Sequence, residues 1–418
     1  MRRLMYSALL VPALLLLGGC QSAPTSSRVA SAPISEPLTT VSVQDAVEIA
    51  PAAPIPEPAK TAAPIDSNTA PKSSAAVTLA TNLNPVPTMS LGPQPSSTAP
   101  ITLLATNFNP VNWPANWQNT WLSLEAWGKY NGLPKPILVN TQPAPSFEYH
   151  TTNGTFQLKV GSRIAHFDGL ECWLGFAPQL IKGFPYIHSA DALKSLQALL
   201  DPPSFHLKPE RLIVLDPGHG GIDSGSKNIY SNKFEKDYTL DWALRLCPLL
   251  QANGWRVVLT RTNDVKLPLE DRVALAERLN ADLFLSLHFN SGLPNKELAG
   301  VETYCLTPQG MPSHLLRVYE DDLKMTFPNN SWDEQNYQIA FRVHRNLIKS
   351  AAAPDRGVRR ARFMGVLRGQ NRPAVLIEGG YLSNPAEAKK IATAAYRQAL
   401  AESIAKALNT DSALAKGE

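Results

Sequence analysis

Short apolar runs alternate with segments of helical periodicity from Leu212 to the end of the chain. Apolar residues at helical spacing, such as Leu240, Leu244 and Cys247, lie between runs that we interpret as buried strands. A last helix is expected from Pro385 to about Leu408. Strands that alternate with helices predict an α/β domain with a doubly wound, mostly parallel sheet. The domain is expected to span 208–412, with strands at 212–215, 257–259, 283–288, 301–306 and 374–378.

A different pattern precedes this domain, from 101 to 203. Trp117, Trp121 and Trp127 lie at helical spacing, which indicates packing in a core, although a surface that stacks on sugar rings is the alternative. Alternating residues on either side of Asn153-Gly154 predict a β-hairpin. We therefore expect a small, β-rich α+β module here, of unknown role.

The first 20 residues have the sequence pattern of a secretory signal peptide. A basic start and an apolar run over 9–17, too short to span a bilayer, lead to Leu17-Gly18-Gly19-Cys20. These four residues resemble the bacterial lipobox, which implies cleavage before Cys20 and attachment of lipid to it. Gln21 follows Cys20, whereas an Asp at this position would resemble the sorting pattern of inner-membrane lipoproteins. The expectation is a periplasmic lipoprotein anchored to the outer membrane through Cys20.

The composition of the chain predicts a linker and argues against some classes of function. Residues 21–100 are rich in Pro, Ala, Ser and Thr, which predicts a disordered tether. The net charge of +4 is mild, so we expect no nucleic-acid partner. Cys172, Cys247 and Cys305 form no Cys-x-x-Cys pair, so a thiolate zinc site is not expected. Their odd number argues against a full disulfide framework and leaves one pair open.

Candidate chemistry lies where the predicted strands end. His219 and His288 each follow an apolar run, and Glu378 follows another before Gly379-Gly380. Because the carboxyl ends of parallel strands share one edge of a sheet, these side chains should converge there. Glu235 adds a carboxylate at the start of the first helix. Two imidazoles and a carboxylate suit Zn²⁺ with one position open for water.

Six motifs in order carry a resemblance that covers roughly the last half of the chain. The chain resembles the zinc-dependent N-acetylmuramoyl-L-alanine amidases of the cell-wall hydrolase type. It departs from their pattern at Tyr381, where a phenylalanine is usual, and this change leaves the expected activity intact. The motifs are Asp216-Pro217-Gly218-His219-Gly220-Gly221, Glu235-Lys236-Asp237, Ser286-Leu287-His288-Phe289-Asn290, Gly300-Val301-Glu302-Thr303-Tyr304, Arg356-Gly357-Val358 and Glu378-Gly379-Gly380-Tyr381-Leu382-Ser383-Asn384.

The resemblance implies the roles of the four candidate residues. His219, Glu235 and His288 fall on the family's zinc ligands, and Glu378 falls on its catalytic glutamate. The implied reaction is hydrolysis of the amide bond between N-acetylmuramic acid and L-alanine in peptidoglycan, in cell-wall remodelling or daughter-cell separation. A protein activator is a further candidate partner. Two alternatives stay open: a zinc peptidase that cleaves peptidoglycan crosslinks, and a non-catalytic wall-binding lipoprotein.

Other polar residues receive more general interpretations. The module at 101–203 resembles, weakly, the small domain named from the amino terminus of copper amine oxidases, which assigns no chemistry. A solvated basic face is expected for the arginines before the last strand except Arg356, which could bind a stem-peptide carboxylate. His344 is expected to be exposed, and His314 is unassigned. The polar segment 307–336 is interpreted as a surface loop, with a cleft-gating helix over 315–325 as the alternative.

Overall fold

The computed structural model describes residues 117, 119–200, 211–315 and 321–409. The predicted signal peptide, the lipid-bearing Cys20 and the tether to residue 100 lie outside the described residues. Within the described ranges, no helix combines the length and the hydropathy that crossing a membrane requires.

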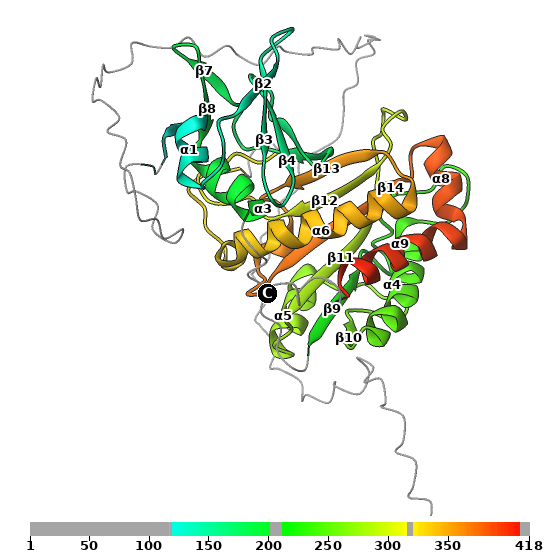
Figure 1. The fold of residues 1–418 in the computed structure, drawn as a ribbon. Coiled ribbons are helices and arrows are strands. Elements are labelled where there is room, and N and C mark those ends of the chain that lie inside the picture. Colours follow the sequence, from blue (N-terminus) through cyan, green and yellow to red (C-terminus); the bar gives the residue numbers. More distant parts are fainter. Residues whose placement is uncertain (1–116, 118, 201–210, 316–320, 410–418) are drawn as a thin grey trace, which may run out of the picture. The chain divides into compact units, whose positions relative to one another are not determined.

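A mixed sheet of eleven strands organises the described chain (Figure 1). Its strand order is β10-β9-β11-β14-β12-β13-β6-β5-β4-β3-β2. Strands β10, β9, β11 and β14 are parallel neighbours, and β12 then joins β14 in the antiparallel sense. The predicted α/β class with a mostly parallel sheet is therefore confirmed. The strands of this half are β9 (Leu212–Pro217), β10 (Arg256–Leu259), β11 (Leu283–Asn290), β12 (Val301–Cys305), β13 (Asp355–Arg360) and β14 (Ala374–Tyr381).

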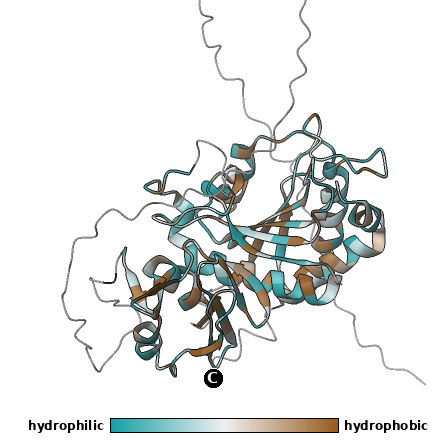
Figure 2. Cartoon of the chain, turned by 90° about the horizontal axis from the view of Figure 1, so that it is seen from above, coloured by the Kyte–Doolittle hydropathy of each residue, from teal (hydrophilic) through white to brown (hydrophobic). Residues whose placement is uncertain are grey.

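Both faces of the parallel strands are buried, which explains why their sequences are continuously apolar. In β9, Ile213 and Leu215 belong to one hydrophobic cluster, whereas Leu212 and Val214 belong to another. The first cluster includes residues of α4, α6 and α9, and the second includes residues of α5 and α7. Hydrophobic residues gather accordingly along the strands and the adjoining helices (Figure 2). The helices are α4 (Glu235–Ala252), α5 (Leu269–Arg278), α6 (Asp333–Ala351), α7 (Gly365–Arg368), α8 (Pro385–Ala392) and α9 (Ala394–Ala407).

The expected single C-terminal helix is two helices, α8 and α9. Thr393 separates them in an extended conformation, with ψ of 137°, and its hydroxyl accepts a hydrogen bond from the N–H of Tyr396 at 3.2 Å. A threonine whose side chain caps the next helix in this way begins a new helix rather than continuing the old one.

The module before the α/β domain is small and mainly β, as predicted. The expected hairpin is present, with β3 (Ser146–His150) antiparallel to β4 (Thr155–Lys159). Trp127 has no exposed surface and contacts Tyr149 edge to face, so its core assignment is confirmed. The other elements are β1 (Trp121–Ser123), α1 (Leu124–Tyr130), β2 (Ile137–Asn140), β5 (Ile164–Phe167), β6 (Leu170–Trp173), β7 (Gln179–Ile181), β8 (Phe184–His188), α2 (Ser189–Asp191), the π-helix η3 (Ala192–Gln197) and α3 (Ala198–Leu200).

The module joins the α/β domain through the sheet itself. Strand β6 pairs with β13 in parallel register at Cys172 and Val358. Cys172, Cys247 and Cys305 are all free thiols, so no pair among them is oxidised in this structure.

Candidate metal centre

The turn after β9 places His219 at the edge of the sheet, as predicted. Gly218 precedes it, and a Cβ there would lie 2.3 Å from Cε1 of His288, so only glycine lets the turn approach the His288 ring on β11. Gly225 closes the same loop at a φ of +64°, where a Cβ would lie 2.7 Å from both Glu235 Cβ and His219 Cδ2. These glycines therefore make room for the converging side chains.

Glu235 enters the site as the first residue of α4. The positive end of the helix dipole favours a negative charge at this place. Backbone N–H groups orient the carboxylate: Ser226 donates to Oε2 at 2.9 Å, and Phe289 donates to Oε1 at 3.0 Å. The carboxylate is thus held in one orientation although it makes no buried pair with Lys or Arg.

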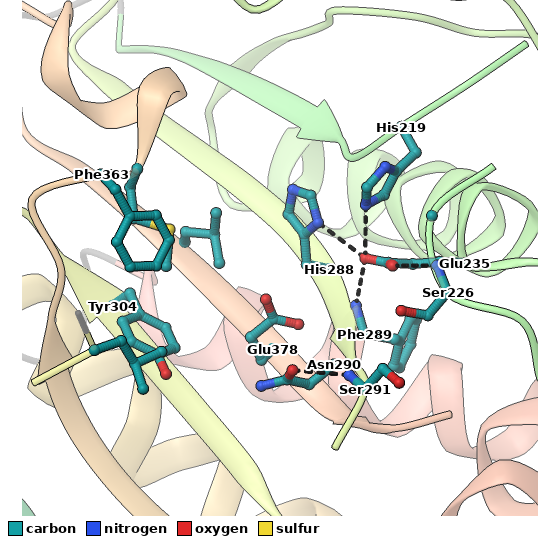
Figure 3. A pocket seen from close by; sticks show the side chains of 14 residues that line it. His219, Ser226, Glu235, His288, Phe289, Asn290, Ser291, Tyr304, Phe363 and Glu378 are labelled. Atoms are coloured by element: carbon teal, nitrogen blue, oxygen red, sulfur yellow. Dashed lines mark hydrogen bonds and ion pairs between the residues drawn. The ribbon is translucent and has the colours of Figure 1, made fainter. Parts of the chain in front are cut away.

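The three predicted ligands meet at one point (Figure 3). Glu235 Oε1 lies 3.1 Å from Nε2 of His219 and 2.9 Å from Nδ1 of His288. One donor atom from each residue lies within 4.8 Å of the other two. Among the described residues, this is the group of His, Cys, Asp or Glu side chains that could hold a metal ion.

Asp223 supports this arrangement from behind. Its Oδ1 lies 2.8 Å from Nδ1 of His219, so Nε2 is the nitrogen turned toward Glu235. Burial lowers the pKa of His219, but hydrogen bonds to Glu235 and Asp223 outweigh it and raise the pKa to about 9. The contacts with both histidines hold the pKa of Glu235 below its usual range despite its burial. The site therefore favours positive charge between these side chains, which a bound cation would also provide.

Glu378 lies on β14 beside this group and faces the same pocket (Figure 3). Its register partners are His288 on β11 and Glu302 on β12. Its Oε2 is buried and has no hydrogen-bond partner. Burial, and then the charges of Glu235 and Glu302, raise the pKa of Glu378 well above its usual value. A buried carboxyl oxygen without a partner is costly, so it favours a functional role.

The pocket has a volume of about 450 Å³ and two chemically different sides. The candidate ligands lie on one side, and Phe363 lies on the other, with Glu378 between them (Figure 3). The apolar side chains that line it are Phe289, Leu315, Phe363, Met364 and Leu376.

Three expectations about basic residues are wrong. Arg359, Arg360 and Arg362 do not form a solvated face: they are 7%, 1% and 1% exposed. Their guanidinium groups have acceptors inside the protein: Arg360 donates to Ser195 Oγ and Lys194 O, and Arg362 donates to Pro308 O and Met311 O.

His344 is likewise buried rather than exposed. Its Nδ1 lies 3.0 Å from Thr303 Oγ1, and its Nε2 lies 2.9 Å from Asp355 Oδ1. His344 therefore links α6 to β12 and β13. Arg356, which we had set apart as a substrate-binding residue, donates to Glu302 Oε1 at 2.7 Å.

The gating helix is not present in the described part of its segment. A turn at residues 323 and 324 is present instead, and 316–320 lie outside the described residues. Asp321 pairs with Arg362 and accepts from Ser313, and Asp322 accepts from the N–H of Lys324. Neither carboxylate is among the pocket-lining residues. The 3₁₀ helix η4 (Pro328–Trp332) then leads into α6.

Several residues around the site escaped the sequence analysis. Glu302 lies within the motif Gly300-Val301-Glu302-Thr303-Tyr304, and Asp223 follows the motif that ends at Gly221. Their acidic side chains were the signal that could have identified them. Arg261 and Arg272 contact the backbone of the His219 turn from separate elements, so no local pattern pointed to them.

Comparisons with known proteins point to one protein family. Residues 213–410 match the protein family described as N-acetylmuramoyl-L-alanine amidase. The chain is 32% identical over 235 residues to N-acetylmuramoyl-L-alanine amidase AmiA of Escherichia coli (strain K12), which covers 50% of this chain and 80% of that protein. The chain is 29% identical over 263 residues to AmiA of Salmonella typhimurium, and this match covers 55% of this chain and 86% of that protein.

A solved structure, that of N-acetylmuramoyl-L-alanine amidase from Clostridium difficile 630, is 29% identical, with a TM-score of 0.42. The match covers 50% of this chain and 100% of the chain in that structure. The 32% identity to the Escherichia coli AmiA, over 80% of that protein, is the basis for assigning this chain to a family. This chain belongs to the N-acetylmuramoyl-L-alanine amidase family.

Proposed function

We propose that His219, Glu235 and His288 hold one zinc ion, with which this chain hydrolyses the amide bond between N-acetylmuramic acid and L-alanine in peptidoglycan. The observation that carries this proposal is the convergence of the three donor atoms within 4.8 Å from a turn, a helix start and a strand. Two imidazoles and a carboxylate are ligands that zinc accepts, and three protein ligands leave a position open, as in catalytic sites.

Glu378 is the residue that we assign to proton transfer. When bound, zinc would supply a Lewis acid that polarises the amide carbonyl and acidifies a water molecule. The unpartnered Oε2 of Glu378 can accept the proton of that water and return it to the alanine nitrogen as the amide breaks.

The pocket also suits the groups on either side of this amide. The scissile bond lies between the methyl-bearing carbon of the lactyl group and the methyl-bearing carbon of L-alanine. Phe363 lies opposite the candidate ligands, and Met364 and Leu376 add further apolar surface to the pocket lining (Figure 3). Burial of a methyl group against such a surface is favourable by about 0.8 kcal/mol.

Two glutamine variants test the proposed roles separately. In Glu378→Gln the shape is kept and the proton acceptor is lost, so turnover should fall by about 10²–10⁴-fold with one zinc still bound. In Glu235→Gln a neutral amide replaces a carboxylate ligand, so the zinc content itself should fall. Metal analysis and turnover of both proteins decide the matter. A fully active, zinc-loaded Glu378→Gln protein would contradict the mechanism.

Product analysis separates the proposal from the two alternatives. Intact peptidoglycan digested by the protein should release stem peptides with a free L-alanine amino group, detected by mass spectrometry. Split crosslinks would instead indicate a peptidase. Unchanged peptidoglycan would indicate a wall-binding protein.

The proposed location follows from the first residues of the chain. We propose that lipid on Cys20 anchors the protein in the outer membrane on its periplasmic side, so that the enzyme reaches the wall. The support is the resemblance of Leu17-Gly18-Gly19-Cys20 to a lipobox. Cys20→Ser should move the protein from the membrane fraction to the soluble fraction, and unchanged partitioning would contradict the anchor.

A further inference from the structure

The turn that carries His219 has an unusual backbone conformation. His219 has a φ of 63°, in the left-handed region that non-glycine residues seldom adopt. Residues held in sparsely populated regions are strained and persist only where the surroundings impose them. The conformation of this turn therefore needs a source outside the turn.

Two buried arginines supply contacts to three consecutive carbonyl groups of the turn. Arg272 donates to Pro217 O at 3.0 Å and to His219 O at 2.8 Å. Arg261 donates to Pro217 O at 2.9 Å and to Gly218 O at 2.8 Å. Both arginines are 2% exposed, so water does not compete for these bonds.

The two cations face one buried carboxylate, that of Asp216. Arg272 donates to it at 2.6 Å, and the hydroxyl groups of Thr260 and Ser286 donate at 2.7 and 2.8 Å. Burial, followed by repulsion from Arg272, lowers the pKa of Arg261 to about 10. Burying a second guanidinium without its own carboxylate is expensive. The carbonyl oxygens of the turn are what offset this cost.

We propose that Arg261 and Arg272 act as positioning residues for metal binding. We call them the carbonyl clamp. The clamp holds the His219 backbone in the left-handed conformation, while Asp223 fixes the ring from its other side. Nε2 is then held 3.1 Å from Glu235 Oε1, so binding of a metal ion does not have to order the turn. This inference rests on the proposed zinc site.

A matched arginine elsewhere separates this role from a purely structural one. Arg372 is 4% exposed and donates to Ala276 O at 2.7 Å and to Ala281 O at 3.0 Å. It also pairs with Glu277. Arg372 thus resembles Arg272 in burial and in its carbonyl acceptors, but none of its bonds goes to the His219 turn.

The test compares the zinc dissociation constants of Arg272→Lys and Arg372→Lys, measured by competition with a chelating dye. Lysine keeps the charge but cannot donate in the fork that reaches Pro217 O, His219 O and Asp216 together. Arg272→Lys should weaken zinc binding by about 10–100-fold, the usual effect of losing an outer partner of a ligand. Arg372→Lys should bind zinc as the wild type does, whatever its stability. Cobalt in place of zinc should show altered visible bands in Arg272→Lys alone.

Each outcome has a defined meaning. Equal zinc affinity in the two lysine variants would overturn the clamp and leave the zinc site standing. A wild-type protein that binds no zinc would overturn the proposed function and the clamp with it. If Arg272→Lys does not fold, Arg261→Lys decides, because Arg261 donates to Pro217 O at 2.9 Å and to Gly218 O at 2.8 Å. Wild-type zinc affinity in a folded Arg261→Lys protein would then overturn the clamp.

Discussion

Glu302 lies directly opposite Glu378 in the antiparallel pair of β12 and β14, yet the two carboxyl groups have opposite surroundings. Glu302 accepts hydrogen bonds from Arg356 and Tyr381 at 2.7 Å on Oε1, and from Tyr304 at 2.8 Å on Oε2. The Oε2 of Glu378 has no partner. Neighbouring carboxylates whose environments push their pKa values apart have different tasks. Glu302 therefore orders the pocket, while Glu378 remains available for chemistry.

The contacts of Tyr381 explain why this chain has a tyrosine where a phenylalanine is usual in the family. Its hydroxyl donates to the buried Glu302, and Arg356 lies 5.3 Å from its ring centroid. Tyr381→Phe should lower the free energy of unfolding by about 1–2 kcal/mol, the value of a bond to a charged group. Turnover should stay near that of the wild type, because Glu302 keeps its other donors. Urea unfolding and steady-state assays measure the two effects, and equal stability would contradict the assigned bond.

The apolar side of the pocket should discriminate between substrates by a methyl group. In Phe363→Ala, the surface opposite the candidate ligands is removed. The preference for a muramoyl-L-alanine substrate over its glycine analogue should then fall by about tenfold, as for one methyl group in an apolar pocket. Values of kcat/KM for the two substrates give the ratio, and zinc content serves as the control for the metal centre. An unchanged ratio would show that Phe363 does not contact the substrate's methyl groups.

Asp191 should make the stability of the module depend on pH. It is fully buried, and burial raises its pKa to about 6 although Gly175 and Phe176 donate to it. Since the folded protein binds this proton more tightly, the stabilisation is complete below the unfolded pKa and is lost as the pH rises through about 6.

The measurement compares the wild type with Asp191→Asn. The difference between their free energies of unfolding should shift by about 1 kcal/mol in favour of the wild type when the pH falls from about 7 to about 5. A difference that does not change with pH would contradict the raised pKa.

How much of the site could be predicted depends on where each signal lies in the chain. His219, His288 and Glu378 were found because each follows an apolar run, and parallel strands bring their carboxyl ends together. The clamp could not be found this way, since Arg261 and Arg272 reach backbone carbonyls 43 to 55 residues away in sequence. Carbonyl groups belong to every residue and leave no pattern in the side-chain sequence.

The errors about basic residues have the same physical origin. Arg360 is buried because the module covers it: Ser195 and Lys194 accept from it, and the ring of Tyr337 lies 4.0 Å away. A local count of charges predicts exposure, whereas contacts between distant elements decide it. The same holds for His344, whose partners Thr303 and Asp355 lie on two neighbouring strands.

Arg163 connects the module to a loop that reaches the pocket, so its loss should alter catalysis from a distance. Its guanidinium donates to Pro312 O at 3.1 Å and to Ser313 O at 3.2 Å, and Leu315, which lines the pocket, lies two residues after Ser313. Arg163→Ala should lower kcat/KM by about tenfold through misplacement of this wall, with zinc affinity unchanged. Arg345→Ala is the control, because Arg345 contacts the module at Asp168 and makes no bond to the loop. Equal losses in both variants would show that general loosening of the module, rather than the loop, sets the activity.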